Sequence, residues 1–260
     1  MTKEMDSLST KLQNLIEFAE SIDDLEKFSN GSSFLSVVIG TLRKDLAIAR
    51  DIQTLTNSQS SGLSTIALCR ILIEDYIHLS YLMNNAEERD VLLKNFNDHP
   101  SVDGYLLSLT LQDLGIEFTQ IEIDTYAKIK LRFDKHKSSF LRFGSESKKI
   151  NPDDYFRTWT KENLNSLIKK SGIIDDGHKN ELRTLMQVYD TGSSVIHHNA
   201  FLIWNLSRVN LELVAETFPG MSLPLVVSTF AKILRIALTA KYENDDKTHL
   251  EKLNELNRII

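Results

Sequence analysis

The sequence predicts an all-α protein, a multi-helix bundle, on three observations. The 260 residues include only 10 glycines and 4 prolines, which is fewer than a turn-rich sandwich or barrel would need. Apolar residues recur with a helical period along most of the chain. No stretch shows the apolar–polar alternation of a half-buried strand, and no internal repeat is visible.

The expected helices follow one another with short polar breaks. Ser32 or Ser33 is placed to cap the second helix, and the third is apolar almost all round, so it should lie at the centre of the bundle. All four prolines fall at expected helix boundaries, and Gly192 is a candidate kink in the penultimate long helix. In chain order the helices are expected over 8–19, 34–48, 63–83, 86–99, 102–114, 121–143, 155–170, 180–207 and from 224 onward.

These elements are expected to form a single helical domain over 1–260. The polar, proline-containing stretch 144–152 is the best candidate for an internal boundary. The chain is long enough to bury a substantial core.

Cysteine content and hydropathy indicate a cytoplasmic protein. A single cysteine, Cys69, cannot form an internal disulfide, and its apolar helix makes it a structural thiol by default. The N-terminal MTKEMDSLST is polar and acidic where a signal peptide would carry an apolar run. The apolar stretch 223–240 contains Lys232 and Arg235, so no membrane association is expected.

The formal net charge is −6, which is not the balance of a general nucleic-acid coat. The net charge is locally positive over 128–149, where phenylalanines are interleaved with basic residues. The functional interpretation is a surface that follows a phosphate backbone and stacks bases. The structural interpretation, which is favoured, is a solvated helix face whose Phe133, Phe140 and Phe143 point into the core. The candidate nucleic-acid-binding residues are Lys128, Lys130, Arg132, Lys135, Lys137 and Arg142.

Two expected helices place polar residues on faces that should be buried. On the third helix, Arg70 and Glu74 lie four residues apart within an apolar stripe, and His78 continues the row one turn further on. On the penultimate long helix, Tyr189, Ser193 and His197 form a second row, again at intervals of four residues. His198 projects away from this row and suits a supporting role, unless a bulge at Gly192 exchanges the two histidines.

The two rows allow a structural and a functional interpretation. In the first, they form a buried hydrogen-bonded network that fixes how the helices register. In the second, they converge in a cleft where Arg70 binds an anion, His197 transfers protons and Glu74 orients one of them. Tyr189, Ser193, His198 and His78 would support these three groups.

A metal site is the least favoured alternative. Glu74 and His78 could supply two ligands from one helical turn, with His197 as a third, but Arg70 would compete for the carboxylate. The sequence has no Gly-rich phosphate loop, no His-Glu-x-x-His motif and no EF-hand pattern. We therefore expect neither a metal nor another cofactor.

Three features resemble a set of prokaryotic all-helical proteins allied to the HEPN superfamily, over roughly 30–210. They are the Arg70-Ile-Leu-Ile-Glu74 helix, a following Trp-containing stretch near Trp159, and the late Tyr189-to-His198 segment. The resemblance implies a helical bundle, often dimeric, with a place among antiviral defence or toxin-type systems.

HEPN nucleases cleave RNA without metal, using an Arg and a His that lie close together on one helix. Here seven residues separate Arg70 from His78 and three separate Arg132 from His136, which is not that spacing. Arg70 and His197 would therefore have to meet from different helices.

The leading hypothesis is an HEPN-like, metal-independent RNase of a bacterial defence or toxin-type system, with RNA as its partner and with a homodimeric state. The alternative is a non-catalytic helical subunit that binds a partner protein of the same operon or a nucleic acid. In that case the C-terminal helix is one candidate docking surface, although it suits the last layer of the bundle slightly better. Its apolar residues are Leu250, Leu253, Leu256, Ile259 and Ile260.

Overall fold

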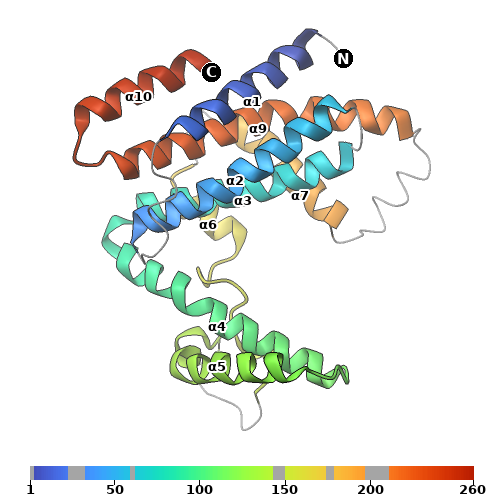
Figure 1. Ribbon diagram of the computed structural model, residues 1–260, viewed down its shortest axis with the longest axis vertical. Helices are drawn as coiled ribbons and strands as arrows, with labels where there is room; N and C mark the ends of the chain where they lie inside the picture. Colours follow the sequence, from blue (N-terminus) through green and yellow to red (C-terminus); the bar gives the residue numbers. More distant parts are fainter. Residues whose placement is uncertain (1–2, 23–32, 59–61, 143–149, 174–178, 197–210) are drawn as a thin grey trace. The chain divides into compact units, whose positions relative to one another are not determined.

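The computed structural model describes residues 3–22, 33–58, 62–142, 150–173, 179–196 and 211–260 (Figure 1). These residues are almost entirely helical, which confirms the predicted all-α class. The only pairing of strand type among them is a single isolated bridge between Leu141 and Tyr155.

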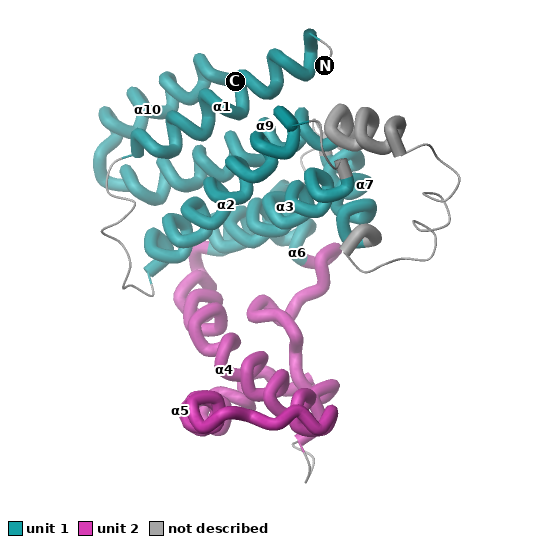
Figure 2. The backbone as a smooth tube through the Cα atoms, turned by 45° about the vertical axis from the view of Figure 1, so that its right-hand side comes forward, with its two compact units in different colours: residues 1–85, 167–260 teal, residues 86–166 magenta. Residues whose placement is uncertain are grey.

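The chain divides into two compact units (Figure 2). Unit 1 comprises residues 1–85 and 167–260, and unit 2 comprises residues 86–166. The prediction was one domain with its best internal boundary at 144–152. The two units change over at 85/86 and at 166/167.

Unit 1 is a bundle built around two long helices. Helix α3 packs against α9, α7 and α2, while α1 and α10 contact each other and α9. The core contains fully buried Ile66, Leu72 and Ile73 from α3 and Phe230 and Leu234 from α9. The prediction of a central third helix is confirmed. The bounds in unit 1 are α1 Lys3–Ser21, α2 Phe34–Asn57, α3 Gly62–Asn84, α6 Leu164–Lys170 (whose first three residues belong to unit 2), α7 Lys179–Ile196, α9 Leu211–Lys241 and α10 Asp246–Ile259.

A local signal explains the start of α2, and burial shows where α10 lies in the bundle. Ser33 caps α2, because its hydroxyl accepts a hydrogen bond from the Ser36 amide at 3.3 Å. In α10, Leu256 is fully buried against the bundle whereas Leu250 is 61% exposed. Helix α10 is thus the outer layer of the bundle, as the favoured interpretation held.

Helix α9 contains the apolar stretch 223–240. Residues Ser222–Lys241 have the length and hydropathy of such a span, but 67% of the most apolar window is buried inside the structure. Burial of this kind is what a central helix of a bundle shows.

Unit 2 is a helical hairpin closed by a loop. Its elements are α4 Arg89–Asp113, α5 Gln120–His136 and the 3-10 turns Ala86–Glu88, Lys137–Phe140 and Pro152–Asp154. The core consists of Val102, Leu106, Phe133, Phe140 and Tyr155. Helix α5 begins with a capping box in which the Thr119 hydroxyl and the Glu122 carboxylate satisfy each other's backbone N–H groups.

The prediction that all four prolines mark helix boundaries is wrong for three of them. Pro100 lies inside α4, which fuses the two helices expected over 86–99 and 102–114. Pro219 and Pro224 lie inside α9. A proline costs a helix about 3 kcal/mol, and burial of the flanking turns can offset that cost. Leu93 and Val102, on either side of Pro100, are both buried.

The helix expected over 155–170 is also wrong in its first half, because only Leu164–Lys170 is helical. Tyr155 is extended, and the Thr160 hydroxyl donates to Thr158 and accepts from the Glu162 amide. Such local side-chain hydrogen bonds compete with the helical ladder. Lys161 adopts a φ of 59°, which also interrupts a right-handed helix.

Candidate functional site

The most prominent polar group in unit 1 is Arg70, on the face of α3 that meets α7. Its Nη2 donates a hydrogen bond to the Tyr189 hydroxyl at 3.2 Å and lies 3.3 Å from the Glu74 carboxylate. The guanidinium carbon lies 4.9 Å from the centroid of the Tyr189 ring, a cation–π distance. The Arg70 side chain is 17% exposed and the Glu74 side chain is 36% exposed. We call Arg70, Glu74 and Tyr189 the Arg70 cluster.

The Arg70 cluster also contains an unsatisfied donor. The Nε atom of Arg70 is buried and has no hydrogen-bond partner among the described residues. A buried N–H without an acceptor is unfavourable. Nε is the one buried polar atom of the Arg70 cluster that lacks a partner among the described residues.

Gly192 explains how α7 comes so close to Arg70. A Cβ atom on Gly192 would lie 2.7 Å from the backbone oxygen of Ile66 and 2.8 Å from the Cβ of Arg70. Helix α7 is continuous through this residue up to Ile196. Gly192 provides close approach of one helix to another, which only a residue without a side chain allows.

Burial and neighbouring charges shape the titration of this region. Burial and the Glu74 carboxylate raise the pKa of Tyr189, and Arg70 opposes them. Burial lowers the pKa of His78, although the carboxylates of Glu74 and Asp75 oppose that shift. The lowered pKa favours a neutral imidazole at neutral pH.

The predicted rows meet at one point within the described residues. Arg70 from the first row contacts Tyr189 from the second, and Glu74 acts on Tyr189 electrostatically, while Ser193 is half-buried one turn after Tyr189. His78 lies one turn beyond Glu74 and interacts with it electrostatically. His197 and His198 lie outside the described residues, so the proximity of Arg70 to His197 stays a prediction.

A second polar cluster, which the sequence interpretation missed, lies between α2 and α3. Asp45 is fully buried, and Lys44 reaches the Asp75 carboxylate with distances of 2.8 and 2.6 Å to its two oxygens. Neither oxygen of Asp45 has a hydrogen-bond partner among the described residues, and the neighbouring Asp75 carboxylate disfavours its charged form. Burial, followed by Asp75, raises the pKa of Asp45 to about 10.

The basic stretch of unit 2 separates cleanly into surface and core. Phe133 and Phe140 are fully buried, so they cannot stack bases, and Phe143 lies outside the described residues. Lys130 and Lys137 both lie within ion-pair distance of Asp134, at 2.7 and 3.7 Å. All six candidate nucleic-acid-binding residues except the half-buried Lys137 are exposed. The interpretation of a charged helix face with phenylalanines in the core is confirmed for the described part.

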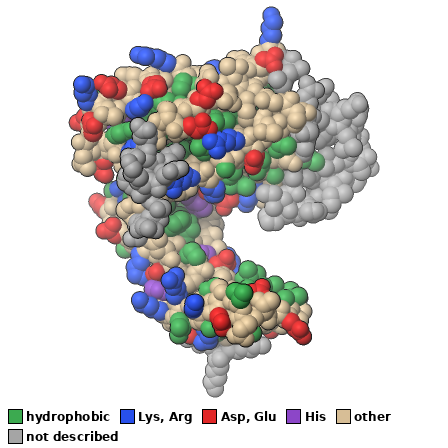
Figure 3. All heavy atoms as spheres, viewed as in Figure 1, with side chains coloured by type: hydrophobic (Ala, Val, Ile, Leu, Met, Phe, Trp, Pro, Cys, Tyr) green, Lys and Arg blue, Asp and Glu red, His purple; other side chains and the backbone are tan. Residues whose placement is uncertain are grey.

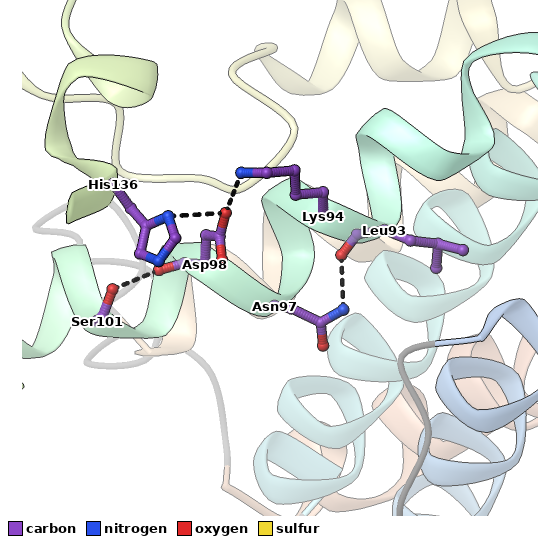
Figure 4. Close-up of polar contacts among 6 residues, drawn as sticks. All are labelled: Leu93, Lys94, Asn97, Asp98, Ser101 and His136. Carbon is purple, nitrogen blue, oxygen red and sulfur yellow. Dashed lines mark hydrogen bonds and ion pairs between the residues drawn. The ribbon is translucent and has the colours of Figure 1, made fainter. Parts of the chain in front are cut away.

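A histidine–carboxylate pair ties the end of α5 to α4 within unit 2 (Figure 4). His136 Nδ1 lies 3.1 Å from an Asp98 oxygen, and Lys94 Nζ lies 2.5 Å from the same oxygen. The Ser101 hydroxyl, on the next turn, donates to the Asp98 backbone carbonyl at 2.7 Å rather than to the histidine. The group therefore fixes the packing of α5 on α4. It is not a serine–histidine–aspartate catalytic arrangement, because Ser101 is not hydrogen-bonded to His136.

The chemistry of the described residues leaves the Arg70 cluster as the candidate site. No group of three or more His, Cys, Asp or Glu side chains that could hold a metal occurs among them. Cys69 is buried, and burial raises the pKa of its thiol to about 12, which keeps it in the unreactive protonated form. The Arg70 cluster is what remains, with a guanidinium, a carboxylate and a phenol within direct contact.

Comparison with known proteins gives one match. No curated protein and no solved structure matches the chain. The match is to a family model over residues 35–210, which include α2, α3, all of unit 2 and α7, and therefore both helices of the Arg70 cluster. The chain belongs to this family, which is described as a family of unknown function, DUF5677.

Proposed function

We propose that the protein is an HEPN-like, metal-independent RNase of a bacterial defence or toxin-type system, with its phosphate site at Arg70. The observation that carries the proposal is the contact between Arg70 and Tyr189, which joins two polar rows from distant parts of the chain. A guanidinium whose Nη2 is held by Glu74 and Tyr189, and whose Nε lacks an acceptor among the described residues, is suited to donate hydrogen bonds to phosphate oxygens.

Each residue of the two rows has a distinct role in this proposal. Arg70 stabilises the negative charge that builds up on the phosphate as the ribose 2′-hydroxyl attacks phosphorus. His197 transfers the proton from the 2′-hydroxyl or to the leaving 5′-oxygen, so that cleavage yields a cyclic phosphate and a 5′-hydroxyl. Glu74, Tyr189 and Ser193 position Arg70 and His197, and His198 and His78 have supporting roles.

The exposed basic residues of α5 supply electrostatic attraction for the RNA backbone in this proposal. Lys128, Arg132 and Lys135 are exposed on this helix. Their attraction to phosphates does not depend on base sequence and weakens with salt.

Removal of Arg70 tests the proposal directly. We expect Arg70→Ala to lower the cleavage rate of a fluorescent single-stranded RNA in EDTA by about 100-fold or more, as loss of one oxyanion ligand does. Arg70→Lys should lose most of the rate as well, since a lysine cannot present the same fork of donors. His197→Ala should have a similar effect because it removes the proton-transfer group.

Arg183→Ala is the matched control, because Arg183 is an exposed arginine on α7. Circular dichroism and thermal melting show whether each variant is folded. Equal cleavage by folded wild type and Arg70→Ala would remove the catalytic role of Arg70. Loss of cleavage by the wild type on EDTA addition would favour a metal-dependent reaction instead.

The alternative function, a non-catalytic helical interaction subunit, is favoured by the partners that Arg70 already has. Glu74 and Tyr189 occupy Nη2 of its guanidinium, as they would in a purely structural network. In that case no RNA is cleaved by the wild type. Arg70→Ala then only lowers the free energy of unfolding, by about 1–2 kcal/mol because Glu74 is partly solvated.

A further inference from the structure

Helix α5 has an exposed face with an unusual composition. Ile121 is 79% exposed and Leu131 is 74% exposed, the highest values among the large apolar side chains in the described part of the chain. At 100° per residue they lie about 80° apart around the helix, with Asp124, Lys128 and Lys135 between them. We call these five residues the α5 outer face; Figure 3 shows hydrophobic and basic side chains side by side on the surface of unit 2.

The spacing within the α5 outer face is that of a coiled-coil seam. Residues 121, 124, 128, 131 and 135 follow one another at alternating intervals of three and four, the spacing of a and d positions in a heptad, with apolar residues at 121 and 131 and charged residues at the other three. The opposite side of the helix is already used, because Phe133 is fully buried in the core of unit 2. Helix α5 thus has one face packed on its own unit and a second face with a seam pattern in water.

The charges on the α5 outer face are complementary to those on the same face of a second, antiparallel copy. In an antiparallel pair with its axis at residue 126, Ile121 lies opposite Leu131 of the second copy, and Asp124 lies opposite Lys128. The two-fold axis repeats each contact, so the face offers two apolar pairs and two ion pairs. No ion pair to Lys128 or Lys135 exists within the described chain, so the two lysines keep their charges available.

We propose that the α5 outer face binds a second copy of this chain, with the two α5 helices antiparallel. A self-complementary patch of this kind is what a two-fold symmetric interface requires. Both signs of charge on one seam fit a second copy better than a nucleic acid as the docked partner, because Asp124 repels the phosphates that Lys128 and Lys135 attract from a distance. The exposed aliphatic Ile121 and Leu131 also gain more from each other than from a phosphate backbone.

The expected dimer is concentration-dependent. Helix α5 is about 25 Å long, and a single helix pair of that length falls toward the small end of specific interfaces. Sedimentation or light scattering of the full chain, from low micromolar to the highest soluble concentration, should show a monomer–dimer equilibrium.

Charge reversal on the seam tests the proposed register. Lys128→Asp places two carboxylates opposite each other twice in the dimer, and we expect at least a tenfold rise in the dissociation constant. Asp124→Lys should do the same with lysines. The double variant Asp124→Lys/Lys128→Asp restores opposite charges and should return the dissociation constant to within about threefold of wild type, a rescue that mere loss of helix stability would not give.

Lys130→Asp is the matched control, because Lys130 lies outside the seam and pairs with Asp134 on its own helix. It should leave dimerisation unchanged. If the lysines of α5 serve only to attract RNA, Lys128→Asp and Lys130→Asp will weaken RNA binding alike and neither will change the dimer. This experiment is independent of the RNase proposal, because it measures mass and not cleavage.

Disulfide cross-linking between introduced cysteines tests whether the two α5 helices are antiparallel. The one native cysteine, Cys69, is buried and does not compete. A mixture of Ile121→Cys and Leu131→Cys chains should form a disulfide between the two kinds of chain, whereas Leu131→Cys alone should not cross-link. Cross-linking of Leu131→Cys alone, a monomer at all concentrations, or a dimer indifferent to both charge reversals would overturn the proposal.

Discussion

Replacement of Asp45 by asparagine is expected to stabilise the protein, by on the order of a few kcal/mol at pH 8. Asp45 is fully buried between α2 and α3 and has Asp75 as its neighbour, so its charged form is strongly disfavoured. Asparagine has nearly the same shape, carries no charge, and can donate a hydrogen bond to the Asp75 carboxylate.

The pH dependence of the Asp45→Asn effect follows from the direction of the pKa shift. The pKa of Asp45 rises from 3.8 to about 10 on folding, so the folded chain keeps a proton that the unfolded chain releases. The stability that the wild type owes to the protonated carboxyl is complete below about pH 4 and is lost as the pH rises toward 10. The gain from Asp45→Asn should therefore be small at pH 4 and large at pH 8.

Urea unfolding of wild type and variant at pH 4, 6 and 8 measures this gain. Asp51→Asn is the matched control, because Asp51 is exposed on the same helix. An effect of equal size at all three pH values, or a loss of stability at pH 8, would show that Asp45 is charged in the folded protein. In that case the orphaned Nη2 of Arg43, on the same helix, would be a candidate partner.

Replacement of Gly192 by alanine is expected to destabilise the protein by about 1–2 kcal/mol, against the usual trend for a helix. Alanine is normally preferred over glycine in a helix by about 1 kcal/mol. Here the added methyl group would lie 2.7 Å from the backbone oxygen of Ile66, which cannot rotate away as a side chain could. Helix α7 must therefore shift from α3, and overpacking of this kind costs about 1–3 kcal/mol.

Gly40→Ala is the control for Gly192→Ala, because a Cβ on Gly40 of α2 would meet nothing within 4 Å. It should gain up to about 1 kcal/mol, so the two glycine variants should change the urea midpoint in opposite directions. The shift of α7 should also weaken the hydrogen bond between Arg70 and Tyr189. If both variants are stabilising, α3 and α7 do not approach each other at Gly192 as closely as the structure shows.

Part of the candidate site could be predicted from helical periodicity alone. The row of Arg70 and Glu74 within the apolar face of α3 is a local property of the sequence, and the structure has the two side chains in contact. Asp45 could have been found by the same test, because it follows Leu42 by three residues on the buried face of α2. Its partner Asp75 could not, since it lies on another helix.

Proline was a poor guide to the helix ends in this chain. Pro100 lies in α4 between the buried residues Leu93 and Val102, so the packing of both flanking turns holds the helix together. Local preference at one residue is worth a few kcal/mol at most, and burial of neighbouring side chains can exceed that.

The sequence by itself determined the helical class, the central position of α3 and the outer position of α10, because amphipathic periodicity repeats within one or two turns. Only the tertiary structure decided which polar groups meet. Arg70 and Tyr189 are 119 residues apart, and their contact depends on the close approach that Gly192 allows. The tertiary structure likewise buried Phe133 and left Ile121 and Leu131 in water. A helical period shows which residues share a face, but the packing of distant helices determines what that face touches.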